Sequence, residues 1–260
     1  MSSSGVPDHC ILHISDTQLL TGDGMGGWTD VGEAVKSLLA ELEAIPARPE
    51  AIVLTGTLPN RYPDHQYTSF RSAVERAAER EGVQVIWAMG NHSENAAHRS
   101  KSLDDDVRGG SGDEVYDVTG LRVITADSNI PGRLHGELDD AQLLWLRSVL
   151  AAPAPHGSIL VLHHPPVPNP EPLMEMGELA GQTPLESVVA GTDIRTVLAG
   201  HLHYSASSTF AQVPVSVAAA ACYTQDLGID WDGTGGQVHL VHTTGSRIMH
   251  STVRVSRNPL

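Results

Sequence analysis

Residues 194–203 have the sequence Ile-Arg-Thr-Val-Leu-Ala-Gly-His-Leu-His, an apolar run that ends in two histidines one residue apart. The apolar and β-branched residues of 194–199 predict a strand, and Gly200 permits a turn directly after it. Two imidazoles that leave such a turn can face neighbouring metal ions, and neutral imidazole is the most common metal ligand in proteins. Taken alone, residues 200–203 also fit an ordinary surface turn. Other segments of the sequence distinguish between these interpretations.

Other predicted strands end in the same way, in small, polar or metal-binding residues. These segments are Ser15-Asp16-Thr17-Gln18, Gly56-Thr57, Gly90-Asn91-His92 and His163-His164. Ligands bind outside the carboxyl ends of the strands in open α/β sheets, so we expect all these segments to converge on one edge. Their recurrence after successive strands favours one shared site over several unrelated turns.

Short β-rich runs alternate with longer segments of helical spacing, which is typical of an α/β fold. Strands are predicted at residues 11–14, 51–54, 83–89, 115–118, 121–126, 158–162 and 194–199, and mainly strands at 209–255. Helices are predicted from near Asp30, over 63–80 and over 139–150. In the last of these, we expect a buried stripe of Ala141, Leu144, Trp145 and Leu146. The pattern predicts two packed mixed sheets flanked by helices.

Composition and charge narrow the class of protein. The chain has 260 residues, with 16 Lys and Arg against 31 Asp and Glu, giving a formal net charge of −15 at pH 7. A protein that binds nucleic acids or anionic membranes needs a basic face, so both are excluded as general partners of this acidic chain. With 40% hydrophobic residues, the chain is expected to form a single domain, residues 1–260.

The cysteines, the first residues and the lengths of the apolar runs predict the cellular location of the protein. Cys10 and Cys222 lie in apolar runs, so we expect buried thiols and a reducing compartment. Residues 1–8 hold no basic segment followed by an apolar stretch, and no apolar run reaches membrane-spanning length. We therefore expect a cytoplasmic protein.

The segments after the strands resemble, in order, the five motifs of the calcineurin-like metallophosphoesterases, and the closest branch is the class III cyclic nucleotide phosphodiesterases. The resemblance extends through residues 12–16, 163–166 and 222–227 and covers most of the chain. It implies an α/β fold that is a four-layer αββα sandwich of two mixed sheets, in agreement with the predicted strands and helices. It also implies a dinuclear metal site and, as in many relatives, a homodimer.

The resemblance also implies roles for particular residues. It gives one metal ion to Asp16 and His203, and the second to Asn91, His163 and His201. It places His92, the acid near the leaving group, among the catalytic residues together with Asn91. The metal is expected to be iron, with manganese or zinc as alternatives that the same donors accept.

Three positions depart from the family pattern. Gln18 stands where the family usually has histidine, Thr57 where it usually has the aspartate that bridges both metals, and Ser93 where it usually has an acidic residue. A glutamine carbonyl is a harder ligand than imidazole. Threonine supplies no negative charge, so two bound cations repel each other more strongly. We expect Gln18 and Thr57 to complete the metal shell, directly or through water.

A weakened dinuclear site leads to three hypotheses about function. The preferred one is a thioesterase that cleaves acyl-CoA-type thioesters with a metal-bound hydroxide, because a thiolate leaves without a strong acid. The class III branch is known to include a thioesterase. The alternative is hydrolysis of a phosphodiester or phosphomonoester, whose transition state carries more charge. The third hypothesis, an inactive binding protein, is disfavoured because most of the site residues remain.

The loop from Pro165 to Gln182 follows His163 and carries Leu173, Met174, Met176 and Leu179. Such a loop can form an adaptable apolar wall or lid beside the site. Packing on the protein's own core, or a dimer interface, explains the same residues equally well. His164 is expected to be structural, with its side chain pointing away from that of His163 as in an extended segment.

Overall fold

The first sheet contains both parallel and antiparallel strands. The computed structural model describes residues 8–17, 48–56, 64–90, 112–130, 132–167, 178–221, 224–225, 231–232 and 236–255. The strands of this sheet are β1 (His9–Ser15), β2 (Ala51–Gly56), β3 (Gln84–Met89), β12 (Gly236–Thr244) and β13 (Arg247–Val255). Their order is β13-β12-β1-β2-β3, with β1, β2 and β3 parallel and β12 and β13 antiparallel to their neighbours.

The second sheet is also mixed. Its strands are β4 (Glu114–Val118), β5 (Leu121–Thr125), β6 (Ser158–Val161), β7 (Ile194–Ala199), β8 (Ala206–Phe210) and β9 (Val213–Val217). Their order is β4-β5-β6-β7-β9-β8, so parallel pairs form the centre and an antiparallel strand lies at each edge. A small separate sheet pairs β10 (Thr224–Gln225) with β11 (Trp231–Asp232).

The described helices are α2 (Asp64–Arg80), α4 (Asp140–Val149) and α5 (Gln182–Val189). The predicted helices over 63–80 and 139–150 are confirmed as α2 and α4, whereas the one from near Asp30 lies outside the described residues. Helix α5 was not predicted, because its N-cap is Gly181, which offers no side-chain hydrogen bond. The helical spacing of its buried residues, Leu185, Val188 and Val189, was the one sequence pattern that indicated this helix.

The predicted stripe on α4 is partly wrong. Leu146 is buried, but Ala141 and Leu144 are exposed, and Leu144 has 62% of its surface accessible. The buried side follows Gln142, Leu146 and Leu150, four residues apart. A polar residue enters this side because the Gln142 amide donates to Asp113 Oδ1 at 2.9 Å and completes the capping box with Asp139.

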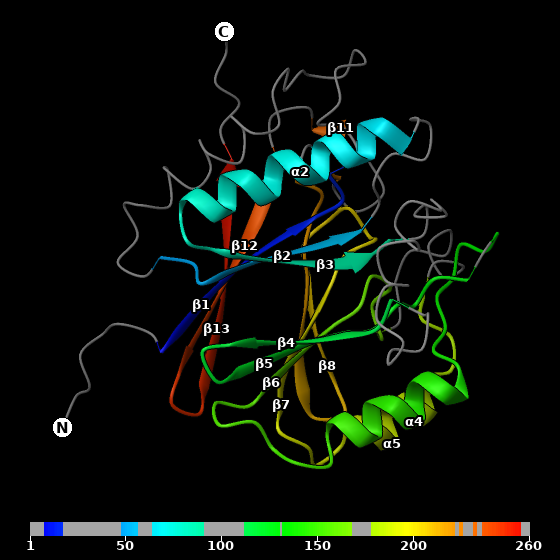
Figure 1. The fold of residues 1–260 in the computed structure, drawn as a ribbon. Coiled ribbons are helices and arrows are strands. Elements are labelled where there is room, and N and C mark those ends of the chain that lie inside the picture. Colours follow the sequence, from blue (N-terminus) through cyan, green and yellow to red (C-terminus); the bar gives the residue numbers. More distant parts are fainter. Residues whose placement is uncertain are drawn as a thin grey trace, which may run out of the picture.

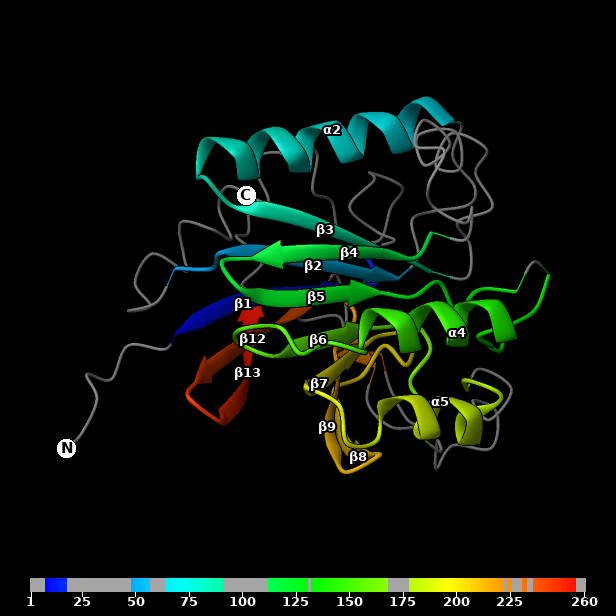
Figure 2. The ribbon, with the colours of Figure 1, turned by 60° about the horizontal axis from the view of Figure 1, so that its bottom comes forward.

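Three separate apolar layers hold the elements together. One lies between α2 and the first sheet and includes Leu12 and Val74, and the second lies between the two sheets and includes Ile11 and Ile159. The third lies between the second sheet and helices α4 and α5. Successive residues of β1 belong to different layers because strand side chains alternate between faces. The four-layer αββα sandwich predicted from the sequence is confirmed, as Figures 1 and 2 show.

The described part of the chain contains no helix long and apolar enough to cross a membrane. Cys10, one of the two cysteines, is buried as predicted. Burial and the neighbouring Glu50 raise the pKa of its thiol to about 12, so this thiol stays protonated and unreactive at neutral pH.

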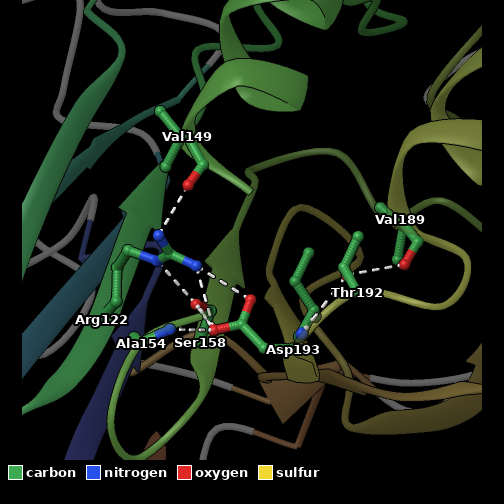
Figure 3. Close-up of polar contacts among 8 residues, drawn as sticks. Arg122, Val149, Ala154, Ser158, Val189, Thr192 and Asp193 are labelled. Carbon is green, nitrogen blue, oxygen red and sulfur yellow. Dashed lines mark hydrogen bonds and ion pairs between the residues drawn. The ribbon is translucent and has the colours of Figure 1, made fainter. Parts of the chain in front are cut away.

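Arg122 and Asp193 form a largely buried ion pair in the second sheet (Figure 3). Arg122 Nη2 donates to both Asp193 oxygens at 2.9 and 3.0 Å, and its Nη1 donates to the Val149 carbonyl at 2.6 Å. Asp193 Oδ2 also accepts from the Ser158 hydroxyl at 2.9 Å and the Ala154 amide at 2.7 Å. The network therefore joins β5, β6 and the segments that precede β6 and β7.

A second buried polar group consists of histidines from the first sheet. His13 and His239 are register partners on β1 and β12, and their rings lie edge to face, 6.3 Å apart between centroids. His239 Nδ1 lies 3.2 Å from the Ser216 hydroxyl, and His250 Nε2 lies 3.1 Å from the Thr196 hydroxyl on the second sheet. Burial and the nearby His250 lower the pKa of His239 to about 4. Burial also lowers the pKa of His250 to about 4.

We expect these histidines to make the fold sensitive to acid. They stay neutral in the folded chain, whereas in the unfolded chain they gain protons below their ordinary pKa of 6.5. Stability is therefore complete above about pH 6.5 and falls as the pH drops to about 4, by about 3 kcal/mol for each histidine. In His250→Gln, the glutamine keeps a donor for Thr196 but cannot titrate. This variant should therefore lose less stability than wild type between about pH 6.5 and pH 4.

Urea unfolding of metal-free protein at a series of pH values measures this loss. The matched control is His156→Gln, which changes an exposed histidine and can keep the contact of that side chain with His9 Nε2 at 2.7 Å. An unchanged pH dependence in His250→Gln would contradict the assignment.

Candidate metal centre

The predicted site residues come from both sheets. Asp16 follows β1 of the first sheet, whereas His163 and His201 follow β6 and β7 of the second. The two sheets meet here, because the Ala221 amide donates to the Ser15 carbonyl at 2.8 Å and Ser15 pairs with Ala220. The convergence predicted for one edge of a sheet therefore occurs between the ends of two sheets.

Asp16 is fully buried and held from several sides. Its Oδ2 accepts from the Ser15 hydroxyl at 2.6 Å and from the His201 amide at 3.0 Å. Two glycines make room for it. A Cβ on Gly56 would lie 2.5 Å from Asp16 Oδ1, and one on Gly200 would lie 1.9 Å from Ser15 Oγ. Only glycine fits at either position, which explains the glycine that ends β2 and the one that follows β7.

Three histidines follow the strands of the second sheet at this point, and each contacts Asp16 or another of the three. His201 Nδ1 lies 3.2 Å from His163 Nε2, and His203 Nε2 lies 3.7 Å from Asp16 Oδ1. Asp16, His201 and His203 have φ angles of 49°, 72° and 59°, in the left-handed region that side chains rarely adopt. Such conformations cost about 1–2 kcal/mol each and concentrate at functional sites. The site thus consists of two donor pairs, Asp16 with His203 and His163 with His201.

His164 does not point away from His163 as expected. Residues 163–164 form a bend, and the rings of these two histidines lie 5.0 Å apart between centroids. His164 Nε2 donates to the Leu134 carbonyl at 3.1 Å, and the Ser128 hydroxyl donates to its Nδ1 at 2.8 Å. Burial, with a further effect of His163, lowers its pKa to about 3. Since both nitrogens have partners, His164 has a structural role although it lies near the other rings.

The donor chemistry of the two pairs fits transition-metal ions. Two nitrogens bound to one ion at about 2.0–2.1 Å lie roughly 2.8–3.4 Å apart in octahedral or tetrahedral geometry. The 3.2 Å between His201 Nδ1 and His163 Nε2 falls in this range. A buried carboxylate with a nearby imidazole, as in Asp16 and His203, supplies a second, mixed oxygen and nitrogen set. The donor atoms of these four side chains therefore suit the metals named from the sequence.

Half of the predicted site residues cannot be placed. Gln18, Thr57, Asn91 and His92 lie outside the described residues. Two glycines that precede residues of this group are described: Gly56 ends β2, and Gly90 directly follows β3.

A cavity of about 550 Å³ opens near the histidines, lined by residues 132–135 and 178–180. His164 adjoins this lining, because its Nε2 donates to the Leu134 carbonyl at 3.1 Å. Arg133 and the 55% exposed Leu134 give the cavity both a cation and an apolar surface. Sequence reasoning missed these residues, because nothing in residues 132–135 signals a site.

The loop predicted as an apolar wall is described only at its ends. Leu179 is 2% exposed and belongs to the core between the second sheet and the helices, so for this residue packing on the protein's own core is confirmed. Leu179 also lines the cavity. Leu173, Met174 and Met176 lie outside the described residues.

Comparison with known proteins identifies a family and relatives that agree with the resemblance seen in the sequence. The model of the calcineurin-like phosphoesterase family matches residues 10–205. A probable cyclic nucleotide phosphodiesterase of Rhodococcus erythropolis is 44% identical over 252 residues, which are 95% of this chain and 84% of that protein. A cAMP/cGMP dual specificity phosphodiesterase of Mycobacterium tuberculosis is 43% identical and covers 95% of this chain and 80% of its own length.

Solved structures agree on the fold. A dimetal phosphatase from Danio rerio superposes with a TM-score of 0.63 at 13% sequence identity, over 96% of this chain and 97% of that one. At this identity the similarity concerns the architecture alone.

Proposed function

Because the chain belongs to the calcineurin-like phosphoesterase family, we propose that it is a metal-dependent phosphodiesterase whose substrates are small phosphodiesters such as 3′,5′-cyclic nucleotides. The observation that carries this proposal is the arrangement of the two donor pairs, Asp16 with His203 and His163 with His201, where the two sheets meet. Two cations held side by side suit a reaction in which negative charge develops on phosphoryl oxygens.

In this proposal, Asp16 and His203 hold one metal ion, and His163, His201 and Asn91 hold the other. Gln18 and Thr57 complete the shell, and the metal is iron, with manganese or zinc as alternatives. When bound, the ions lower the pKa of a coordinated water and neutralise charge on the phosphoryl group. Asp16 contributes a negative charge, and the imidazoles bind as neutral donors. His92 protonates the leaving alkoxide.

The relatives favour phosphodiester hydrolysis over the thioesterase that the altered motifs suggested. The curated relatives of highest identity given above are named as cyclic nucleotide phosphodiesterases, and none of the comparisons reported supports a thioester substrate. The preference for acyl-CoA rested on Gln18 and Thr57 and on the thioesterase known in the class III branch. Relatives at this identity are stronger evidence, so the phosphodiester becomes our main hypothesis. A homodimeric, cytoplasmic enzyme stays a prediction.

The cavity supports a substrate with an organic part beside its phosphate. Its volume of about 550 Å³ lies within the usual 300–1,000 Å³ of small-molecule sites. The net charge of −15 disfavours an anionic substrate over most of the surface. Arg133 at the cavity offsets this charge locally, and Leu134 offers an apolar contact.

Substrate assays test this proposal directly. We expect the manganese-loaded protein to hydrolyse bis(p-nitrophenyl) phosphate and 3′,5′-cyclic AMP, to lose both activities with a chelator, and to leave a panel of acyl-CoA thioesters intact. Thioester cleavage without phosphodiester cleavage would establish the opposite assignment. A metal-loaded protein that cleaves neither class would indicate a binding protein on this fold.

A further inference from the structure

Behind Asp16, three side chains form a continuous chain of hydrogen bonds. The Ser15 hydroxyl contacts Asp16 Oδ2 at 2.6 Å, the Thr55 hydroxyl contacts Ser15 Oγ at 2.9 Å, and His13 Nε2 contacts Thr55 Oγ1 at 2.8 Å. His13, Ser15 and Asp16 are completely buried, and Thr55 is 2% exposed. The contacts follow from the sheet register, which places Ser15 beside Thr55 on parallel strands, with His13 on the same face of β1.

The protons in this chain can point in only one direction. An ionised Asp16 only accepts, so the Ser15 proton points to Oδ2, and Ser15 Oγ must accept from Thr55. Thr55 has then used its one proton, which leaves His13 Nε2 as a donor. The imidazole must therefore be the neutral Nε2–H tautomer, and burial lowers the pKa of His13 well below its ordinary value. His13 Nδ1 has no hydrogen-bond partner among the described residues, so the chain ends there.

With the protons oriented in this way, the two oxygens of Asp16 have different partners. Oδ2 accepts the end of the hydrogen-bond chain and the His201 amide at 3.0 Å. Oδ1 is the oxygen that faces His203, with 3.7 Å to its Nε2. Gly200 connects the chain to the histidine loop, since a Cβ there would lie 1.9 Å from Ser15 Oγ and 3.1 Å from Thr55 Oγ1.

We propose that His13, Thr55 and Ser15 form a positioning relay that holds Asp16 through Oδ2, so that Oδ1 alone binds a metal ion. The proposal rests on the metal-dependent function proposed above. Aligned donors stabilise the carboxylate charge and fix its orientation, and each lost partner behind a metal ligand typically weakens metal affinity 10- to 100-fold. The three residues act through Asp16 and do not touch the substrate.

Thr55→Val tests the relay, because it removes the hydroxyl while keeping the side-chain shape. Titration of Mn²⁺ into metal-free protein should show an affinity about 10- to 100-fold lower than wild type. Thr55→Ser keeps the hydroxyl and should restore affinity to within about threefold. The matched control is Thr243→Val, a buried threonine at the far end of β12 whose Oγ1 has no partner among the described residues. It should bind Mn²⁺ like wild type.

The outcomes separate the relay from a merely structural role and from the proposed function. A folded Thr55→Val protein with a lower melting temperature but wild-type Mn²⁺ affinity overturns the relay. Ser15→Ala gives the same comparison if Thr55→Val does not fold. Wild-type protein that binds no metal overturns both proposals. Wild-type protein that binds Mn²⁺ through the relay but hydrolyses no phosphodiester overturns the proposed function alone.

Discussion

His201→Ala is expected to lower kcat/KM on bis(p-nitrophenyl) phosphate by about 10³-fold or more, because metal ions supply several kcal/mol of transition-state stabilisation. The change removes a nitrogen 3.2 Å from His163 Nε2, so one member of this donor pair is lost. The His201 amide still donates to Asp16 Oδ2, because that contact comes from the backbone. The loss should therefore concern metal binding rather than the fold.

Steady-state kinetics together with the metal content of the same preparation measure this effect. His156→Gln is the control. It changes an exposed histidine before β6, at the other end of this strand from the site, and glutamine can keep the contact that His156 Nδ1 makes with His9 Nε2 at 2.7 Å. Activity within about threefold of wild type in His201→Ala, with metal retained, would contradict a ligand role for His201.

Asp193→Ala is expected to lower the free energy of unfolding by about 3–5 kcal/mol, because it leaves the buried Arg122 guanidinium without its counter-ion. It also removes the acceptor of the Ala154 amide and of the Ser158 hydroxyl. Exposed fractions of 14% for the Arg122 side chain and 11% for that of Asp193 leave little room for water to replace the lost contacts.

Urea denaturation provides the comparison. Glu75→Ala is the control, because Glu75 and Arg71 form a more exposed pair on α2, and such surface pairs contribute at most about 1 kcal/mol. Equal losses in the two variants would show that burial does not strengthen the Arg122–Asp193 pair. The folded fraction of Asp193→Ala should still bind metal, since the network lies away from Asp16.

Most of the architecture could be predicted because local signals and tertiary contacts agree. Ile11 and Leu12 alternate between two apolar layers, as a doubly covered strand requires. Asp139 and Gln142 begin α4 with a capping box. Gly56 at the end of β2 and Gly200 after β7 are needed where the backbone passes close to Asp16 and Ser15. At these positions one residue type satisfies the local backbone and the site together.

What could not be predicted depends on contacts between distant segments. The orientation of His164 follows from a bend and from partners at Ser128 and Leu134, more than 25 residues away. Gln142 enters the core only because Asp113 accepts its amide. The hydrogen bonds behind Asp16 require the register of β1 with β2, which brings together residues about 40 positions apart. On strands such as β1, the sequence pattern indicates which face a residue occupies, but it does not identify the residue's partner.

The central claim is that Asp16, His163, His201 and His203 hold metal ions for phosphoester hydrolysis. Elemental analysis of freshly purified, tag-free protein tests it most directly, with His201→Ala prepared in parallel. The account predicts at least one iron, manganese or zinc ion per wild-type chain and a clear loss of metal in the variant. Wild-type protein that holds no transition metal, even after these metals are added back, would contradict it.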